Sequence, residues 1–307
     1  MEASMQTNYT YASALAASQR INWRVEDIIG GEKRLDFDKP FMPEALARIA
    51  PLDSLSAREK LLLNQIRGHG YLYQFGLVEE FILPFLLDHT RTRLAGNDAR
   101  CRAFLQFAGE EAKHIDLFKR FRAEFQKGFS TECEVIGPPE VIAEAVLKHK
   151  PLSVALLILH IEWMTQRHFI ECIRDDRGLD RQFASMLRHH WMEEAQHAML
   201  DTLMVAELAK DMPEAEIVSA VDGYLEIGAM IDDGLKQQTL FDLAALMKAS
   251  GRRLGEAEHA RLAEQQHQAQ RWTYIGSGMS HPNFLGTVQQ LSPASGKRLA
   301  EIAPAFC

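Results

Sequence analysis

Cysteine is scarce in this chain, and its spacing excludes several kinds of site. The four cysteines are Cys101, Cys133, Cys172 and Cys307, and no two of them form a Cys-x-x-Cys pair. Zinc ribbons and rubredoxin-type iron sites need such pairs, and a disulfide framework needs a denser set of cysteines. We therefore expect four reduced thiols and no cysteine-bound metal.

Long apolar runs are also missing. The longest, Leu152 to Leu159, is interrupted by Ser153, whereas a membrane-spanning helix needs about 20 apolar residues. Residues 1–20 lack the basic start and apolar centre of a secretory signal. The sequence thus predicts no membrane span and a cytoplasmic location.

The chain has no excess of positive charge. Its 34 Lys and Arg residues face 42 Asp and Glu residues, which gives a formal net charge of −8. Nucleic-acid binding needs a basic surface, so we expect no nucleic-acid partner. With 47% hydrophobic and 25% charged residues, the composition is that of a globular protein.

Strand-like alternation is nearly absent, and helical periodicity indicates an all-α fold. Residues 1–55 read as irregular, with a short helix near 44–49. A capping box at Ser56 and Glu59 predicts that a long helix begins there and runs to about residue 92. Pro84 should bend this helix near Glu80, because it removes one backbone hydrogen bond.

Three more long helices are expected, at about 97–128, 151–175 and 180–210, with a shorter one at 139–149. Beyond them we expect a helix broken at Gly223, Gly228 and Gly234, a polar helix at 255–275 and a short helix at 282–291. Because no repeat or flexible linker is visible, the sequence predicts one helical domain, residues 1–307. Its four-helix core covers about 56–210, and accessory helices cover about 213–307.

The motif Glu-x-x-His occurs four times, where chance would give about one. Two copies, Glu256/His259 and Glu264/His267, lie in a segment that is polar on nearly every helical face. We interpret them as part of a solvated helix.

The other two copies lie in apolar stripes. Glu111 and His114 share a helical face with phenylalanines, and Glu194 and His197 share one with Phe183 and Trp191. A carboxylate in such a stripe is costly unless it is paired or binds a metal. At 100° per residue, His190 falls within a 60° arc with Glu194 and His197, which places three candidate ligands together.

The two remaining long helices each supply a glutamate on an apolar side, Glu162 on one and Glu79 or Glu80 on the other. The order Glu, Glu-x-x-His, Glu, Glu-x-x-His is the arrangement of di-iron and di-manganese sites in four-helix bundles. The alternative is a set of separate buried Glu–His hydrogen bonds. Both Glu79 and Glu80 have apolar neighbours, and we favour Glu80 because Pro84 would loosen the helix there.

Three further carboxylates are candidates for a supporting role. Glu110 and Glu193 each precede a candidate ligand, and each could reach across to the histidine of the opposite helix and fix its tautomer. The alternative for both is exposed surface charge. Asp201, one turn after His197, is a weaker candidate.

With these residues in place, the chain resembles the ferritin-like di-iron carboxylate superfamily over about residues 60–210. The segment HHWMEEAQH, with its extra His190, is similar to the seven-ligand site of the arylamine (p-aminobenzoate) N-oxygenases. Radical-generating reductase subunits would have a tyrosine where this chain has Phe118. The resemblance implies a ferritin-like four-helix bundle and seven metal ligands: Glu80, Glu111, His114, Glu162, His190, Glu194 and His197.

The resemblance further implies two iron ions, or manganese in their place, that activate O₂ to oxidise a small organic substrate such as an aryl amine. It implies no catalytic residues beyond the ligands, and it suggests a homodimer. Since no flavin or nicotinamide fingerprint is visible, an external electron donor is expected. The alternatives are another di-metal oxidase, a desaturase, a metal-dependent hydrolase, or a non-enzymatic iron-binding helical protein.

Overall fold

The computed structural model describes residues 9–91 and 98–307, and every named element in those ranges is a helix. Within them, the one β-type pairing is an isolated bridge between Gly30 and Lys33. The prediction of an all-α fold is therefore confirmed.

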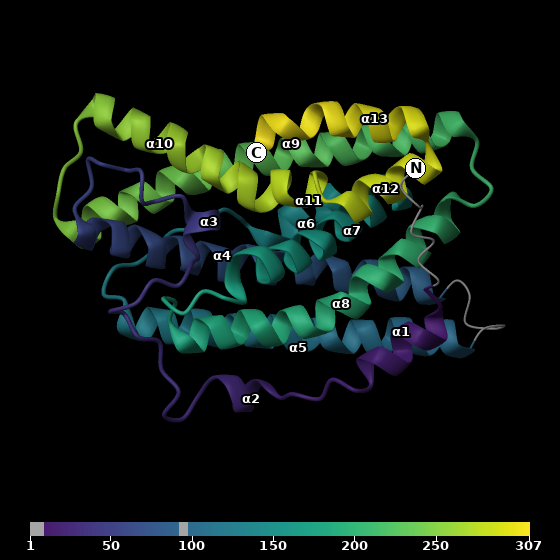
Figure 1. Cartoon of the computed structure of the whole chain (residues 1–307), viewed down its shortest axis with the longest axis horizontal. Helices are drawn as coiled ribbons and strands as arrows, with labels where there is room; N and C mark the ends of the chain where they lie inside the picture. Colours follow the sequence, from purple (N-terminus) through teal and green to yellow (C-terminus); the bar gives the residue numbers. More distant parts are fainter. Residues whose placement is uncertain (1–8, 92–97) are drawn as a thin grey trace.

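Four long helices form the core of the molecule (Figure 1): α4 (Ala57–Arg91), α5 (Asp98–Gly128), α7 (Pro151–Arg167) and α8 (Arg181–Ala209). Helix α4 packs along α5, and α7 packs along α8, as two hairpins. Their bounds agree closely with the predicted ranges. The predicted capping box is present, since the Ser56 backbone N–H donates to Glu59 Oε2 at 2.8 Å. Helix α4 continues past Pro84 to Arg91.

Helix α9 (Glu214–Ser250) packs against both α4 and α7. It is continuous, so the predicted breaks at Gly223, Gly228 and Gly234 are wrong. At two of these positions glycine serves close packing instead. A Cβ at Gly223 would lie 2.6 Å from Ser153 Oγ, and one at Gly234 would lie 3.3 Å from a methyl carbon of Ile136.

The remaining elements cover the core. On the N-terminal side they are α1 (Tyr11–Ser18), α2 (Val25–Ile28) and α3 (Glu44–Ala47). Helix α6 (Pro139–Leu147) and the π-helical η1 (His168–Ile173) flank α7. The C-terminal elements are α10 (Glu256–Arg271), η2 (Trp272–Gly276), α11 (Ser277–Met279), α12 (Pro282–Leu291), α13 (Pro293–Ile302) and η3 (Ala303–Phe306).

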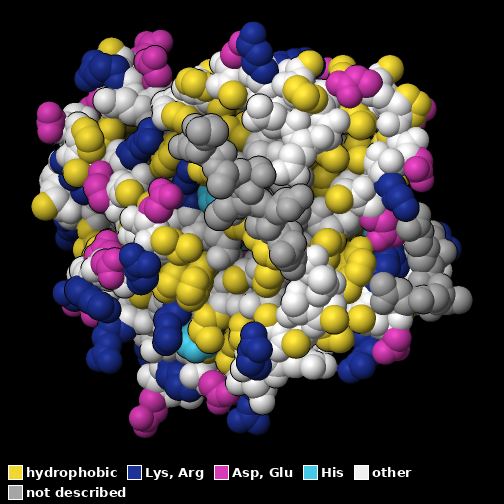
Figure 2. Space-filling view, turned by 45° about the vertical axis from the view of Figure 1, so that its right-hand side comes forward, with side chains coloured by type: hydrophobic (Ala, Val, Ile, Leu, Met, Phe, Trp, Pro, Cys, Tyr) yellow, Lys and Arg dark blue, Asp and Glu magenta, His cyan; other side chains and the backbone are white. Residues whose placement is uncertain are grey.

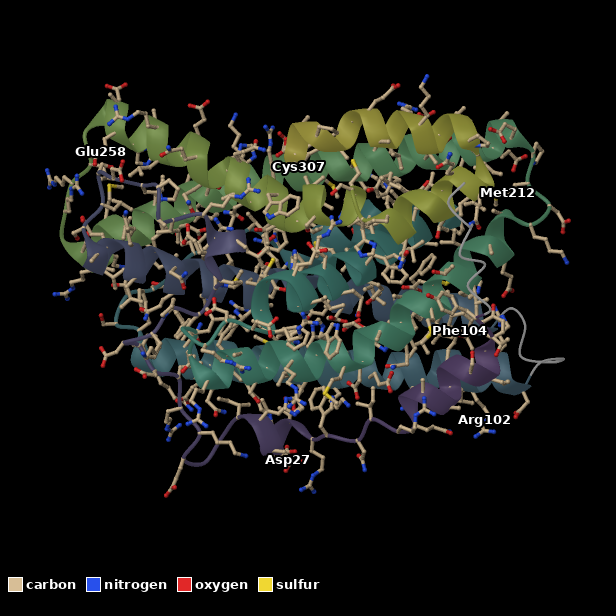
Figure 3. The ribbon with its side chains drawn as sticks, in the orientation of Figure 1. Asp27, Arg102, Phe104, Met212, Glu258 and Cys307 are labelled. Carbon is tan, nitrogen blue, oxygen red and sulfur yellow. The ribbon has the colours of Figure 1, made fainter. Side chains whose placement is uncertain are left out.

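Helix α1, which the sequence did not predict, packs against α5 and α8. Phe104 marks the place where α1 crosses α5 (Figure 3), and its ring centroid lies 5.6 Å from that of Tyr11. Thr10 caps the helix through the backbone N–H of Ser13. Helices α2 and α13 were likewise not predicted.

Buried side chains from the N-terminal helices through η3 form one continuous hydrophobic core. This supports the predicted single domain, which stays a prediction. On the face drawn in Figure 2, hydrophobic side chains form small groups among charged residues of both signs. Among the described residues, no helix is both long and apolar enough to cross a bilayer.

Candidate metal centre

The core helices bring six of the predicted ligands together inside the bundle. Helix α5 supplies Glu111 and His114, α7 supplies Glu162, and α8 supplies His190, Glu194 and His197. Each side chain is at most 2% exposed. The helical periodicity explains the placement, because all six lie on the inward-facing stripes of their helices.

The structure corrects the choice between the two adjacent glutamates on α4. Glu79 is buried and belongs to the cluster, with Oε1 3.1 Å from His190 Nε2. Glu80 points away from it, and its Oε1 lies 2.7 Å from the ammonium of Lys119. The expected loosening at Pro84 does not bring Glu80 inward, because successive residues of a helix differ by about 100° in direction.

The donor atoms converge on two overlapping groups. One contains Glu79, His114, His190 and Glu194, and the other contains Glu111, His114, Glu194 and His197. Within each group the donor atoms lie within 4.8 Å of one another. First-row metals bind such ligands at about 2.0–2.2 Å, which separates opposite ligands by about 4.2 Å. The groups are therefore close to the size that a metal ion requires.

Glu194 joins the two groups. Its Oε1 lies 2.6 Å from His190 Nε2 and 3.1 Å from His114 Nδ1, and its Oε2 lies 2.8 Å from His197 Nδ1. Glu111 lies on the other side, with Oε1 2.9 Å from His197 Nδ1. A carboxylate between two sets of imidazoles could serve as a ligand in both groups.

Several of these close contacts are not hydrogen bonds. Both oxygens of Glu111, Oε1 of Glu194 and Nδ1 of His114 are buried without a hydrogen-bond partner. Glu111 Oε1 lies 2.9 Å from His197 Nδ1, yet the two atoms form no hydrogen bond. A hydrogen bond needs alignment as well as a short distance. Buried groups left unpaired in this way are costly. Glu111, His114 and Glu194 all belong to the groups whose donor atoms could hold a metal ion.

Glu162 and Asp201 lie near Glu194 and add two carboxyl groups to the same side of the cluster. Oε2 of Glu162 and both oxygens of Asp201 are buried without a hydrogen-bond partner. Burial, and then the nearby Glu194, raise the pKa of Glu162 well above its usual range. Burial also raises the pKa of Asp201 well above its usual range.

Glu110 and Glu193 each contact a histidine of the opposite helix. His114 Nε2 lies 2.8 Å from Glu193 Oε2, and His197 Nε2 lies 2.9 Å from Glu110 Oε2. Because a carboxylate only accepts, both Nε2 atoms carry the proton. The Nδ1 atoms face the cluster.

Electrostatics favour protonated histidines when no cation is bound. Burial lowers the pKa of His114, but Glu194 and Glu193 outweigh it and hold the pKa well above its usual range. His197 behaves in the same way, with Glu194 and Glu110 as its partners. Burial opposes ionisation of Glu194, but His190 and His197 hold its pKa well below the usual range. The buried carboxylates thus favour a positive charge in the cluster, either on the histidines or on a bound cation.

Two residues of this region were not foreseen. The ring of Trp23 stacks on that of His114, with centroids 6.0 Å apart and planes 9° from parallel. Lys113 lies 3.9 Å above the Trp23 ring and also pairs with Glu193. The position of Lys113 could have been predicted from helix geometry, because it immediately precedes His114 on α5. Trp23 lies in the irregular N-terminal segment, where no periodic pattern indicates its partner.

The two motifs that the sequence set aside lie outside the cluster, in α10. His267 Nε2 contacts Asp232 Oδ1 at 2.8 Å on α9. Neither motif contributes to the groups of metal-binding donors found among the described residues.

An apolar cavity of about 260 Å³ lies beside the cluster, between α4, α6, α7 and α9. Its wall includes Phe75 and Val78 of α4 and Ile161 of α7. These residues flank Glu79 and Glu162 in the sequence. The ring centroid of Phe75 lies 5.5 Å from that of His190, so one aromatic ring separates the cavity from a candidate ligand.

No family model and no curated protein matches the chain, but solved structures do. A tyrosine-to-phenylalanine variant of an R2-like ligand-binding oxidase with a Mn/Fe cofactor aligns with a TM-score of 0.50 at 13% identity, covering 88% of this chain and 95% of that one. The chain has a ferritin-like helical fold. A glycine-to-leucine variant of an R2-like ligand-binding oxidase, with a Fe/Fe cofactor, aligns with a TM-score of 0.49 at 14% identity over 87% and 94% of the two chains.

At these identities the likeness concerns the ferritin-like fold alone. It agrees with the predicted ferritin-like fold and does not single out the arylamine N-oxygenases. The case for a metal centre in this chain therefore rests on its own donor atoms.

Proposed function

We propose that the chain is a di-metal oxygenase that holds two iron ions, or manganese, between its four core helices and uses O₂ to oxidise a small organic substrate. The proposed ligands are Glu79, Glu111, His114, Glu162, His190, Glu194 and His197. The observation that supports it most strongly is the set of buried, unpartnered donor atoms that converge on two adjacent points.

The donor set also balances charge. Its four carboxylates, from Glu79, Glu111, Glu162 and Glu194, neutralise two divalent cations. Mixed carboxylate and imidazole donors suit iron and manganese. A purely structural network would pair its oxygens with hydrogen-bond donors, yet those of Glu111 have none.

When bound, two such ions supply an O₂-activating redox centre. The protein's part is positional. Glu193 and Glu110 accept the Nε2 protons of His114 and His197 and so leave each Nδ1 lone pair facing the cluster. Phe107 stacks on His197 at 3.8 Å and, with the surrounding core, keeps water out. The apolar cavity beside Phe75 is the place for the substrate.

For the reaction we propose oxidation of an aryl amine at nitrogen by O₂. One oxygen atom is inserted at the nitrogen, and the other leaves as water after taking up two protons and two electrons from an external donor. The support for this finer statement is the similarity of HHWMEEAQH to the arylamine N-oxygenases. A desaturase or hydrolase acting at the same centre would give different products from the same assay.

The test is metal-dependent O₂ consumption. Protein loaded with Fe²⁺ without air is mixed with O₂, a chemical reductant and 4-aminobenzamide, and O₂ uptake and oxidised amine are measured. We expect uptake that needs both metal and amine. Glu111→Gln should abolish it, whereas the matched Glu80→Gln, whose carboxylate contacts Lys119 outside the cluster, should keep it. Equal uptake by both variants, or none with the wild type, would overturn the proposal.

A further inference from the structure

We propose that the cavity between α4, α6, α7 and α9 binds an uncharged, single-ring substrate that carries one hydrogen-bond-accepting group, and that it rejects the carboxylated counterpart of that substrate. The inference rests on the proposed function, since it takes the cavity to be the substrate site of the metal centre. It adds the chemical class of the substrate.

The cavity opens where the two hairpins of the bundle are least closely joined. Helices α5 and α8 contact each other directly, whereas α9 packs across both α4 and α7. Phe75 forms part of the cavity wall, and its ring packs edge-on against that of His190. A molecule in the cavity therefore lies one side chain away from the cluster.

The lining carries no charge. None of its residues is Asp, Glu, Lys, Arg or His, and the polar side chains among them are Gln74, Gln237 and Tyr274. The guanidinium of Arg67 is near Tyr274 but is not part of the lining. Its Nη1 donates to Gln266 at 2.9 Å and its Nε lies 4.0 Å from Asp242, whereas its Nη2 has no hydrogen-bond partner among the described residues. An ionised carboxylate held in this cavity would find no cation among the lining residues, and an unpaired buried charge is strongly unfavourable.

Because Gln237 is exposed, two of the three polar side chains, Gln74 and Tyr274, are placed to recognise a buried ligand. Gln74 is 8% exposed, and its Nε2 has no hydrogen-bond partner. No described residue hydrogen-bonds the Tyr274 hydroxyl, and burial raises its pKa, so it stays an uncharged donor at neutral pH. Both groups donate, which favours a ligand with an accepting oxygen such as a carbonyl.

The volume of the cavity accommodates a ligand with one ring and a small substituent. An apolar cavity of about 150 Å³ is enough for benzene, and this one measures about 260 Å³. The remaining volume accommodates an amide or amine group on the ring.

The experiment compares two nearly isosteric probes, 4-aminobenzamide and 4-aminobenzoate, which differ in charge at pH 7.5. Binding to the metal-loaded protein is measured by calorimetry without O₂, so that it does not depend on turnover. We expect the benzamide to bind at least about tenfold more tightly than the benzoate. Equal binding, or tighter binding of the benzoate, would overturn the inference.

Variants identify the site. Gln74→Leu removes a donor and should weaken benzamide binding about fivefold, whereas Gln74→Arg should reverse the preference in favour of the benzoate. Leu157→Phe fills part of the cavity and should weaken both probes. The matched control, Gln126→Leu, replaces an exposed glutamine outside the cavity and should change neither.

The outcomes separate this inference from the proposed function. If O₂ uptake needs metal but the benzamide does not bind, or binds unchanged in Gln74→Leu and Leu157→Phe, the metal centre stands and the substrate class is wrong. If the benzamide binds as expected but no metal-dependent uptake occurs, the cavity stands as a binding site and the oxygenase proposal fails. Thermal unfolding of each variant shows that it is folded.

Discussion

Glu162→Gln should leave the metal-free protein nearly as stable as the wild type while weakening its stabilisation by metal. Burial and the nearby Glu194 raise the pKa of Glu162 well above its usual range, which favours the protonated side chain when no ion is present. A neutral glutamine of almost the same shape then replaces a neutral carboxylic acid. Once metal enters, however, glutamine cannot supply the negative charge that the ion requires.

The size of the effect follows from mass action. An ion that binds only the folded state at 100 times its dissociation constant stabilises it by about 2.7 kcal/mol. Unfolding entropy of about 2.1 cal/mol/K per residue amounts to roughly 0.64 kcal/mol/K for this chain, so each ion should raise Tm by about 4 °C. Two ions give about 8 °C in the wild type. In Glu162→Gln we expect this shift to fall to half or less.

The assay is thermal unfolding with and without Fe²⁺ under anaerobic conditions, with Mn²⁺ as a second ion. The control is Glu226→Gln, an exposed glutamate far from the cluster in sequence. The reasoning is refuted if Glu162→Gln lowers the Tm of the metal-free protein by several degrees and keeps the full metal shift. Glu162 would then be a structural partner of Glu194 rather than a ligand.

Three other changes test the remaining parts of the site. Glu193→Gln leaves His114 without its anionic acceptor and should weaken metal affinity by about 10–100-fold, measured by competition with a chelator; unchanged affinity would contradict the orienting role. Glu79→Ala should lower metal content while Glu80→Ala should not, and the reverse result in elemental analysis would restore the sequence-based choice. Burial lowers the pKa of His168 to about 3, against about 6.5 when unfolded, so the stability it contributes is complete above pH 6.5 and falls by about 2 kcal/mol by pH 5. His168→Asn should flatten that decline in urea unfolding, and an unchanged decline would show that His168 is not its source.

The long helices and the order of their ligands could be predicted because both depend on local periodicity. A buried face repeats every three to four residues, and Glu-x-x-His places both side chains on that face. The choice between Glu79 and Glu80 could not be made in the same way. Both have apolar neighbours, and the rotation of α4 about its axis is set by packing against its partners.

Features that depend on tertiary contacts were missed for a related reason. The glycines of α9 suggest helix breaks, yet Gly223 allows Ser153 to approach closely and the helix continues. Trp23 reaches His114 from a segment without periodicity. The homodimer, the external electron donor and the cytoplasmic location stay predictions, because they concern surfaces and partners that neither helix periodicity nor the core determines.

Anomalous X-ray scattering from crystals of the metal-loaded protein, recorded at the iron and manganese edges, tests the central claim most directly. We predict two peaks inside the bundle, one on either side of Glu194. One peak should lie among Glu79, His114 and His190, and the other among Glu111, Glu162 and His197. A map with no peak at these residues, or with a single one, would contradict the account.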